Sequence, residues 1–123
     1  MSVASAEIAH TAATCSHTQF ALVGYSQGAD AAGDLAAQIG NGHGPVPAAK
    51  LLAVGLVSDP GRTTVGEPLI GPPAVGVGLA GDLRGGFGAV ASRVVTLCAP
   101  TDLYCATSSP PTASLSLLRR CAG

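Results

Sequence analysis

The sequence has 123 residues, the length of one domain with a single hydrophobic core. Hydrophobic residues make up 47% and charged residues 11% of it, and a chain this apolar is not intrinsically disordered. Six basic and seven acidic side chains give a net charge of -1, so the sequence offers no basic surface for nucleic acid or for anionic lipid.

The first predicted elements are a helix, a strand and a second helix. Residues 3–13 are rich in alanine, which favours a helix. The short apolar run at 19–24 is typical of a fully buried strand. Residues 27–39 combine alanine and leucine with acidic residues near the start, which favours a second helix, and a glycine-rich turn at 40–42 ends it.

Two further apolar runs, at 51–57 and 94–97, predict two more strands. Residues 60–88 lie between them, are rich in glycine and proline, and predict an irregular surface loop with a functional or lid-like role. The order strand, helix, strand with continuous apolar strands favours a parallel sheet in an α/β fold. Prolines and glycines interrupt the uncharged stretch between Glu67 and Asp82, so we predict no transmembrane segment.

The most specific motif is Gly24-Tyr25-Ser26-Gln27-Gly28, a G-x-S-x-G sequence between a predicted strand and a predicted helix. In this context the serine occupies a tight turn that exposes its hydroxyl above the carboxyl edge of the sheet. Both glycines are expected to be required, because side chains there would collide with neighbouring backbone. The backbone N–H of Gln27, at the start of the helix, is placed to donate to a developing oxyanion. An incidental serine in a glycine-rich turn is the alternative.

A second candidate site is the segment Cys98-Ala-Pro-Thr-Asp102-Leu-Tyr-Cys105, directly after the third predicted strand. A disulfide between its two cysteines would close a small loop, stabilise the fold by about 2.5 kcal/mol and hold Asp102 rigid. Because the carboxyl ends of parallel strands share an edge, we expect Asp102 on the same side of the sheet as Ser26, where a triad acid has to lie. A stapled surface hairpin with Asp102 as a turn residue is the alternative.

Together these segments resemble the cutinase family of secreted serine esterases. The resemblance rests on the GYSQG motif with its alanine-rich helix, on Cys15 ahead of it, on Asp59-Pro60 after a strand, and on the C-x3-D-x2-C loop. The wording CAPTDLYC and the glycine- and proline-rich insert are most similar to cutinase-like proteins of mycolate-containing actinobacteria.

The resemblance implies a partial α/β-hydrolase domain, a three-layer fold with a parallel central sheet. It implies Ser26 as nucleophile, Asp102 as triad acid, Gln27 as oxyanion donor, and a disulfide between Cys98 and Cys105. It also implies hydrolysis of carboxylic esters through an acyl-serine intermediate, with an ester or lipid substrate and no cofactor or metal. A secreted or cell-envelope location follows from the family, although the sequence shows no signal peptide.

The sequence departs from the family pattern at the general base. The family histidine follows the acid, whereas the last histidine here is His43. We expect His10, His17 and His43 to lie far from Ser26, given the rise of strands and helices. The family's N-terminal part, with its first strands and second oxyanion donor, has no counterpart in this sequence. We therefore expect a truncated chain whose esterase activity is impaired.

These departures divide the sequence into a partial cutinase-like domain at 1–105 and an atypical tail at 106–123. They leave Cys15 without its family partner, free to stay buried, to pair with Cys121 or to link two chains. Absent strands would leave a sheet edge open, which predicts self-association. The alternative to an esterase is a non-catalytic fragment or interaction protein with a hydrolase-derived fold.

Overall fold

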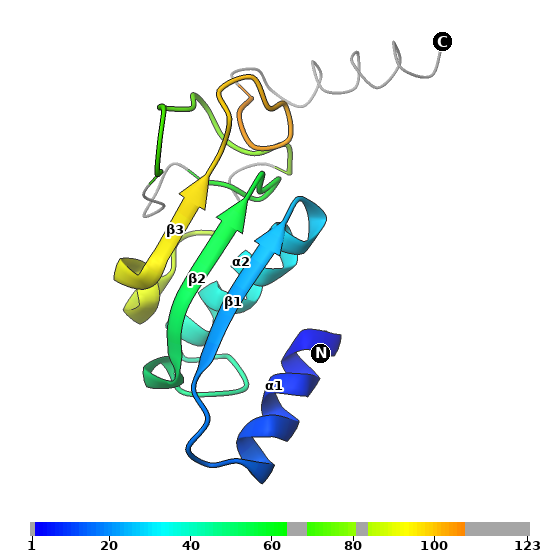
Figure 1. Ribbon diagram of the computed structural model, residues 1–123, viewed down its shortest axis with the longest axis vertical. Coiled ribbons are helices and arrows are strands. Elements are labelled where there is room, and N and C mark those ends of the chain that lie inside the picture. Colours follow the sequence, from blue (N-terminus) through cyan, green and yellow to red (C-terminus); the bar gives the residue numbers. More distant parts are fainter. Residues whose placement is uncertain (1, 64–68, 81–83, 108–123) are drawn as a thin grey trace.

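The computed structural model describes residues 2–63, 69–80 and 84–107 of the chain (Figure 1). Two helices and three strands make up the fold, with short 3-10 helices before β2 and β3. In chain order they are α1 (Val3–Thr14), β1 (Phe20–Tyr25), α2 (Gln27–Gly40), η1 (Ala48–Lys50), β2 (Leu51–Val57), η2 (Gly88–Arg93) and β3 (Val94–Leu97).

The predicted helices and strands are all confirmed, and their ends differ from the expected ones by no more than one residue. Side chains cap both helices. The Ser2 hydroxyl accepts from the Ser5 N–H at 3.1 Å and begins α1. Asn41 follows α2 and donates its side-chain amide to the Ala37 carbonyl at 2.8 Å, which satisfies a carbonyl of the last turn.

The three strands form one parallel sheet in the order β1-β2-β3, which confirms the predicted sheet. The register pairs Tyr25 with Val57, and Val57 with Leu97, at the last position of each strand. All three arrowheads therefore point to one edge (Figure 1), and the residues that follow the strands meet there. This carboxyl edge is the place where a parallel sheet positions functional side chains.

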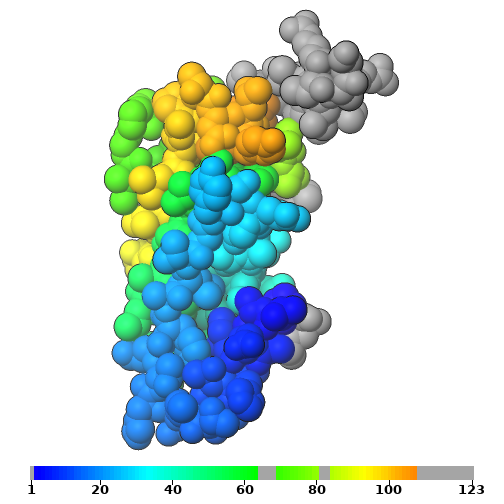
Figure 2. Space-filling model, turned by 45° about the vertical axis from the view of Figure 1, so that its right-hand side comes forward, coloured from blue at the N-terminus to red at the C-terminus, as the bar shows by residue number. Residues whose placement is uncertain are grey.

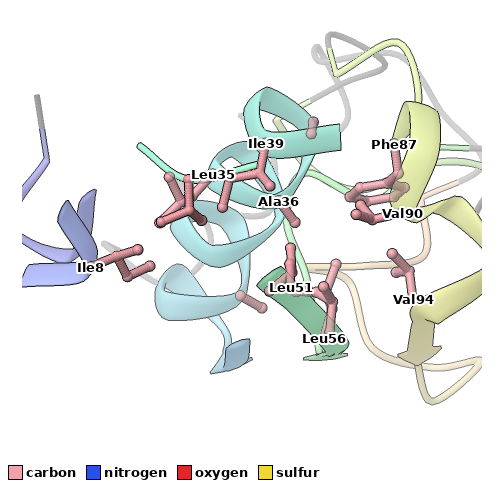
Figure 3. Close-up of a cluster of buried hydrophobic side chains, with 13 residues drawn as sticks. Ile8, Leu35, Ala36, Ile39, Leu51, Leu56, Phe87, Val90 and Val94 are labelled. Carbon is pink, nitrogen blue, oxygen red and sulfur yellow. The ribbon is translucent and has the colours of Figure 1, made fainter. Parts of the chain in front are cut away.

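The hydrophobic core lies between one face of the sheet and the helices (Figure 3). Leu51 and Leu56 of β2 are fully buried against Ile39 of α2 and Val90 of η2. Ile8 of α1 extends the same cluster on the far side of α2. Each such side chain contributes about 1.5–3 kcal/mol through burial, which anchors α2 on the sheet behind the candidate nucleophile.

The opposite face of the sheet is exposed within the described residues, so the expectation of fully buried strands is wrong. Val23 and Tyr25 of β1 are 80% and 73% exposed, and Leu97 of β3 is 42% exposed. Continuous apolar runs predicted cover on both faces, but the core cluster joins α1, α2 and η2 to a single face. In Figure 1 α2 passes behind the strands, and the described residues form the sheet and one helical layer.

The glycine- and proline-rich segment at 60–88 is irregular, as predicted, but it is not only a surface loop. Arg62, Thr63 and Phe87 are buried. Leu69 bridges to Thr96 on the outer side of β3, and the Ile70 N–H donates to the Thr96 carbonyl at 2.9 Å. The described parts of the segment therefore pack against the sheet, because their backbone groups find partners there. A lid-like role stays a prediction.

Candidate active site

Ser26 occupies the turn that joins β1 to α2. Its backbone has φ 55° and ψ -121°, a conformation that L residues rarely adopt. The Ser26 N–H donates to the Val57 carbonyl at 2.9 Å, and its carbonyl accepts from the Ala29 and Asp30 N–H groups at 2.9 and 3.2 Å. The turn is thus bonded to both the sheet and the helix. It leaves Ser26 half-buried at the carboxyl edge, the geometry of a nucleophile elbow.

The two glycines around Ser26 have different surroundings. A Cβ at Gly24 would lie 2.4 Å from the Gly28 carbonyl oxygen, so no side chain fits where β1 passes α2. A Cβ at Gly28 would meet nothing within 4 Å. The expected steric need is therefore confirmed for Gly24 and wrong for Gly28, which is exposed on the first turn of α2.

Gln27 is the first residue of α2. The N–H groups of a first helical turn have no carbonyl partner inside the helix, and the positive end of the helix dipole lies beside them. An oxyanion that forms on a substrate attacked by Ser26 would find the Gln27 N–H one residue away along the backbone. The role of Gln27 as oxyanion donor stays a prediction with this local support.

Asp102 lies at the same edge, in residues 98–107, which we call the acid loop. The predicted disulfide between Cys98 and Cys105 is confirmed and closes this loop, with 5.9 Å between the two Cα atoms. The Tyr104 N–H donates to Oδ1 of Asp102 at 2.9 Å. The hydroxyl of Ser58, which follows β2, donates to Oδ2. Figure 2 shows the acid loop in orange above the blue tip of β1.

Arg62 fastens the acid loop to the glycine- and proline-rich segment. Its side chain donates through Nε to the Cys105 carbonyl at 2.6 Å and through Nη2 to the carbonyls of Val75 and Gly76 at 3.0 and 2.7 Å. Arg62 is 3% exposed, and these carbonyl oxygens supply the polar partners that a buried guanidinium needs. The segment that precedes β3 is thereby connected to the acid loop that follows β3.

The three histidines lie elsewhere, as predicted. His10 is in α1, His17 precedes β1, and His43 follows the carboxyl end of α2; all three are exposed. The start of β1 and the end of α2 lie at the amino edge of the sheet, opposite to Ser26 (Figure 1). None of these imidazoles is therefore positioned as a base for Ser26.

The buried Arg84 side chain forms an ion-pair cluster beside α2. Its side chain is 2% exposed and pairs with Asp59 at 2.7 Å, Asp34 at 3.0 Å and Asp30 at 3.4 Å. Burial raises the pKa of Asp30, the neighbouring Asp34 and Asp59 carboxylates raise it further, and Arg84 opposes the rise. A Cβ at Gly33 would lie 2.4 Å from the guanidinium carbon, so the helix is open at this position to admit Arg84.

A cavity of about 420 Å³ adjoins this cluster. Its lining includes Asp30, Asp34, Gln38, His43 and Arg84, and it does not include Ser26 or Asp102. The cavity is therefore separate from the candidate ester site. Across the part of the chain that the structure describes, no group of three or more His, Cys, Asp or Glu side chains is arranged to hold a metal ion.

Comparison with known proteins decides the family. The profile of the family described as Cutinase matches residues 1–121. The chain belongs to the cutinase family. It is also 37% identical over 119 residues to the carboxylesterase Culp6 homolog of Corynebacterium glutamicum, an alignment that covers 80% of this chain and 38% of that protein. The chain therefore spans well under half the length of this curated cutinase relative.

Two solved structures share the fold of this cutinase-family chain. The catalytic core domain of acetyl xylan esterase from Trichoderma reesei superposes with a TM-score of 0.65 at 24% identity, over 97% of this chain and 62% of that one. An acetylxylan esterase solved at 0.90 Å has a TM-score of 0.64 at 17% identity, over 98% and 68% of the two chains. These similarities confirm the predicted partial α/β fold.

Sequence reasoning missed three residues at or near the candidate site. Ser58 bonds to Asp102, Arg62 fastens the acid loop, and Arg84 holds the first turns of α2. A signal existed for Ser58 alone, because it directly follows a predicted strand whose end had to lie at the carboxyl edge. Cys15 carries a free, exposed thiol, which excludes the buried state that had been one of its three alternatives. Cys121 lies outside the described residues.

Proposed function

We propose that this chain carries the nucleophile and acid of a carboxylic ester hydrolase site, with Ser26 as nucleophile and Asp102 as triad acid. One observation carries the proposal: the strained Ser26 turn and the acid loop occupy the same edge of a parallel sheet. Membership of the cutinase family supports it. The reaction class needs no cofactor.

The proposed reaction runs in two steps. The Ser26 Oγ attacks the ester carbonyl carbon and transfers its proton to a base, while the carbonyl oxygen becomes an oxyanion that accepts from the Gln27 N–H. The tetrahedral intermediate then expels the alcohol, which takes up the proton, and leaves an acyl-serine. Water attacks this second ester in the same way, releases the carboxylic acid and restores Ser26.

The general base limits this chain. A serine hydroxyl reacts slowly unless a base lies within hydrogen-bond reach, and the histidines of this chain lie away from the carboxyl edge. In triad enzymes that have lost one member, the oxyanion hole and substrate binding still supply part of the rate enhancement. We therefore expect slow acylation of Ser26 that added imidazole accelerates, because imidazole supplies the missing kind of base.

The test is the rate at which a fluorophosphonate probe labels Ser26, with and without imidazole, in the wild-type chain and in Ser26→Ala. We expect slow labelling of the wild type, faster labelling with imidazole, and none in the variant. Peptide mapping places the label. Absence of labelling under both conditions, in a sample whose circular dichroism shows a folded chain, would contradict the proposal.

That negative result would favour the second candidate, a non-catalytic interaction protein. The exposed apolar face around Val23, Tyr25 and Leu97 supports this alternative, because large exposed apolar patches commonly mark contact sites.

We further propose self-association through the free thiol of Cys15 or through the outer edge of β1. A secreted or cell-envelope location and an ester or lipid substrate remain proposals drawn from the family. None of the described helices has the length and apolar character needed to span a membrane.

A further inference from the structure

Ser58 shares an unusual backbone conformation with the candidate nucleophile. Ser26 and Ser58 both have φ 55°, and among the described residues they are the two that are not glycine and have positive φ. Each directly follows a strand, and the strands pair through Tyr25 and Val57. The two strained serines are therefore neighbours at the carboxyl edge. Strain of this kind persists only where surrounding contacts hold it, and it gathers at functional sites.

The hydrogen bonds of Ser58 connect it to the end of β3 and to the acid loop. Ser58 is 8% exposed, and its N–H donates to the Leu97 carbonyl of β3 at 3.0 Å. Its hydroxyl donates to Oδ2 of Asp102, while the Tyr104 N–H donates to Oδ1. In the described part of the chain no other side chain bonds to this carboxylate.

The two donors to Asp102 do different work. Tyr104 belongs to the acid loop, as Asp102 does, so its bond orients the carboxylate within the loop and not directly against the sheet. Ser58 belongs to the end of β2, the strand paired with the strand of Ser26. Its hydroxyl is therefore the one side-chain bond, among the described residues, that ties the Asp102 carboxylate to the sheet edge.

We propose that Ser58 is a positioning residue for the triad acid and fixes the carboxylate of Asp102 relative to Ser26. The inference rests on the proposed function. The backbone at position 58 would be less strained with glycine, which adopts positive φ readily. Relative to glycine, serine adds a β-carbon and a hydroxyl, and the hydroxyl is bonded to Asp102.

The experiment measures fluorophosphonate labelling of Ser26, with and without imidazole, in Ser58→Ala, Ser58→Gly and Asp102→Ala. Asp102 acts through a base, so loss of its position affects the imidazole-dependent rate more than the imidazole-free rate. We expect the imidazole-dependent rate to fall at least about tenfold in both Ser58 variants. A misplacement of about 1 Å can lower a rate roughly 100-fold, so this loss lies within the expected range. The ratio of the imidazole-dependent rate to the imidazole-free rate should fall in both Ser58 variants, as in Asp102→Ala, and stay at the wild-type value in the control. Ser92→Ala, at an exposed serine in η2, is the matched control.

The glycine variant separates positioning from stability. Ser58→Gly relieves the backbone strain that Ser58→Ala keeps, so its urea midpoint should be the higher of the two. If Ser58 only stabilised the fold, imidazole-dependent labelling would recover in the glycine variant, or both rates would fall together. Either result overturns the proposal.

Complete absence of labelling in the wild type would by itself contradict the proposed function. Amide hydrogen exchange then still tests whether Ser58 positions Asp102. Without the Ser58 hydroxyl the carboxylate is free to turn, so the Tyr104 amide should exchange faster in Ser58→Gly. The Ser26 amide, bonded to Val57, is the internal reference. Unchanged Tyr104 exchange would overturn the inference.

Discussion

The backbone around Ser26 is held by close packing at a single glycine. Gly24 lets the end of β1 approach the first turn of α2 until only a hydrogen atom fits between them. Gly28 sits in open space, so the motif contains one glycine required by sterics and one that is not. The pattern alone could not distinguish them, because both flank the serine symmetrically.

Gly24→Ala and Gly28→Ala form a matched pair that tests this difference. At Gly24 the added Cβ meets backbone atoms, which cannot rotate away, so we expect a loss of about 1–3 kcal/mol in the free energy of unfolding. Probe labelling of Ser26 should fall with it. At Gly28 alanine should be neutral or stabilising by up to about 1 kcal/mol, because it favours the helix. Urea unfolding measures both, and equal losses would contradict the assignment.

Asp30 predicts a pH dependence with a definite sign. Its pKa is raised in the folded protein, mainly by burial, so the folded state binds a proton more tightly than the unfolded state does. Below the unfolded value the carboxyl is neutral in both states, and as the pH rises through the raised folded pKa its ionisation lowers stability. The urea midpoint of Asp30→Asn should therefore be higher than that of the wild type at pH 7. The difference between the two midpoints should shrink as the pH falls toward 3.8, the ordinary pKa of an aspartate side chain. A difference that is flat across pH would point to a cause other than titration.

At the scale of whole elements, Arg84 joins the glycine- and proline-rich segment to α2 and to the end of β2. The Arg84–Asp59 pair is fully buried, so removal of the cation leaves the Asp59 carboxylate without a counter-ion, with only the Gly61 N–H as donor among the described residues. We expect Arg84→Met to lower the free energy of unfolding by about 3–5 kcal/mol, and Arg84→Met combined with Asp59→Asn to regain part of it. The matched control is Arg93→Met. The Arg93 guanidinium contacts the carbonyls of Ala48 and Leu51, so its loss should cost only about 1.5–3 kcal/mol. A double variant no more stable than Arg84→Met would contradict this view of the cluster.

The elements themselves were predictable, and the contacts between them were not. Apolar runs predicted the strands and alanine-rich segments predicted the helices, because those signals are local in sequence. The Arg84–Asp34 bond, by contrast, joins residues 50 positions apart, and nothing in the spacing of either residue indicates the other. The same applies to Arg62, whose partner Cys105 is 43 positions away. Ser26 and Asp102 could be placed at one edge because that follows from parallel strands, whereas the exposed sheet face could not be foreseen from apolar runs.

At the scale of the whole molecule, β1 is an edge strand of the described sheet, and its outward face is apolar. An exposed strand edge can pair with another chain, so we expect the elution volume of the wild type to fall with increasing protein concentration. Val23→Lys should weaken this association. Val23 is 80% exposed, so a charge there disfavours the pairing of β1 with another chain and leaves the core unchanged. Cys15→Ser is the control for the thiol. Association that survives Val23→Lys but disappears in Cys15→Ser would assign the contact to Cys15 instead.

The bonds that hold the acid loop have a consequence for the order in which the site assembles. Ser58 and Asp102 are 44 residues apart in sequence, and Arg62 and Cys105 are 43 apart. Among the described residues, the turn at Ser26 has one long-range bond, to Val57, but its other two bonds join it to Ala29 and Asp30, its near neighbours. Contacts that close long loops form late, because the chain entropy they remove is larger. We therefore expect the turn at Ser26 to form before Asp102 is held beside it, and Asp102 to be released first on unfolding.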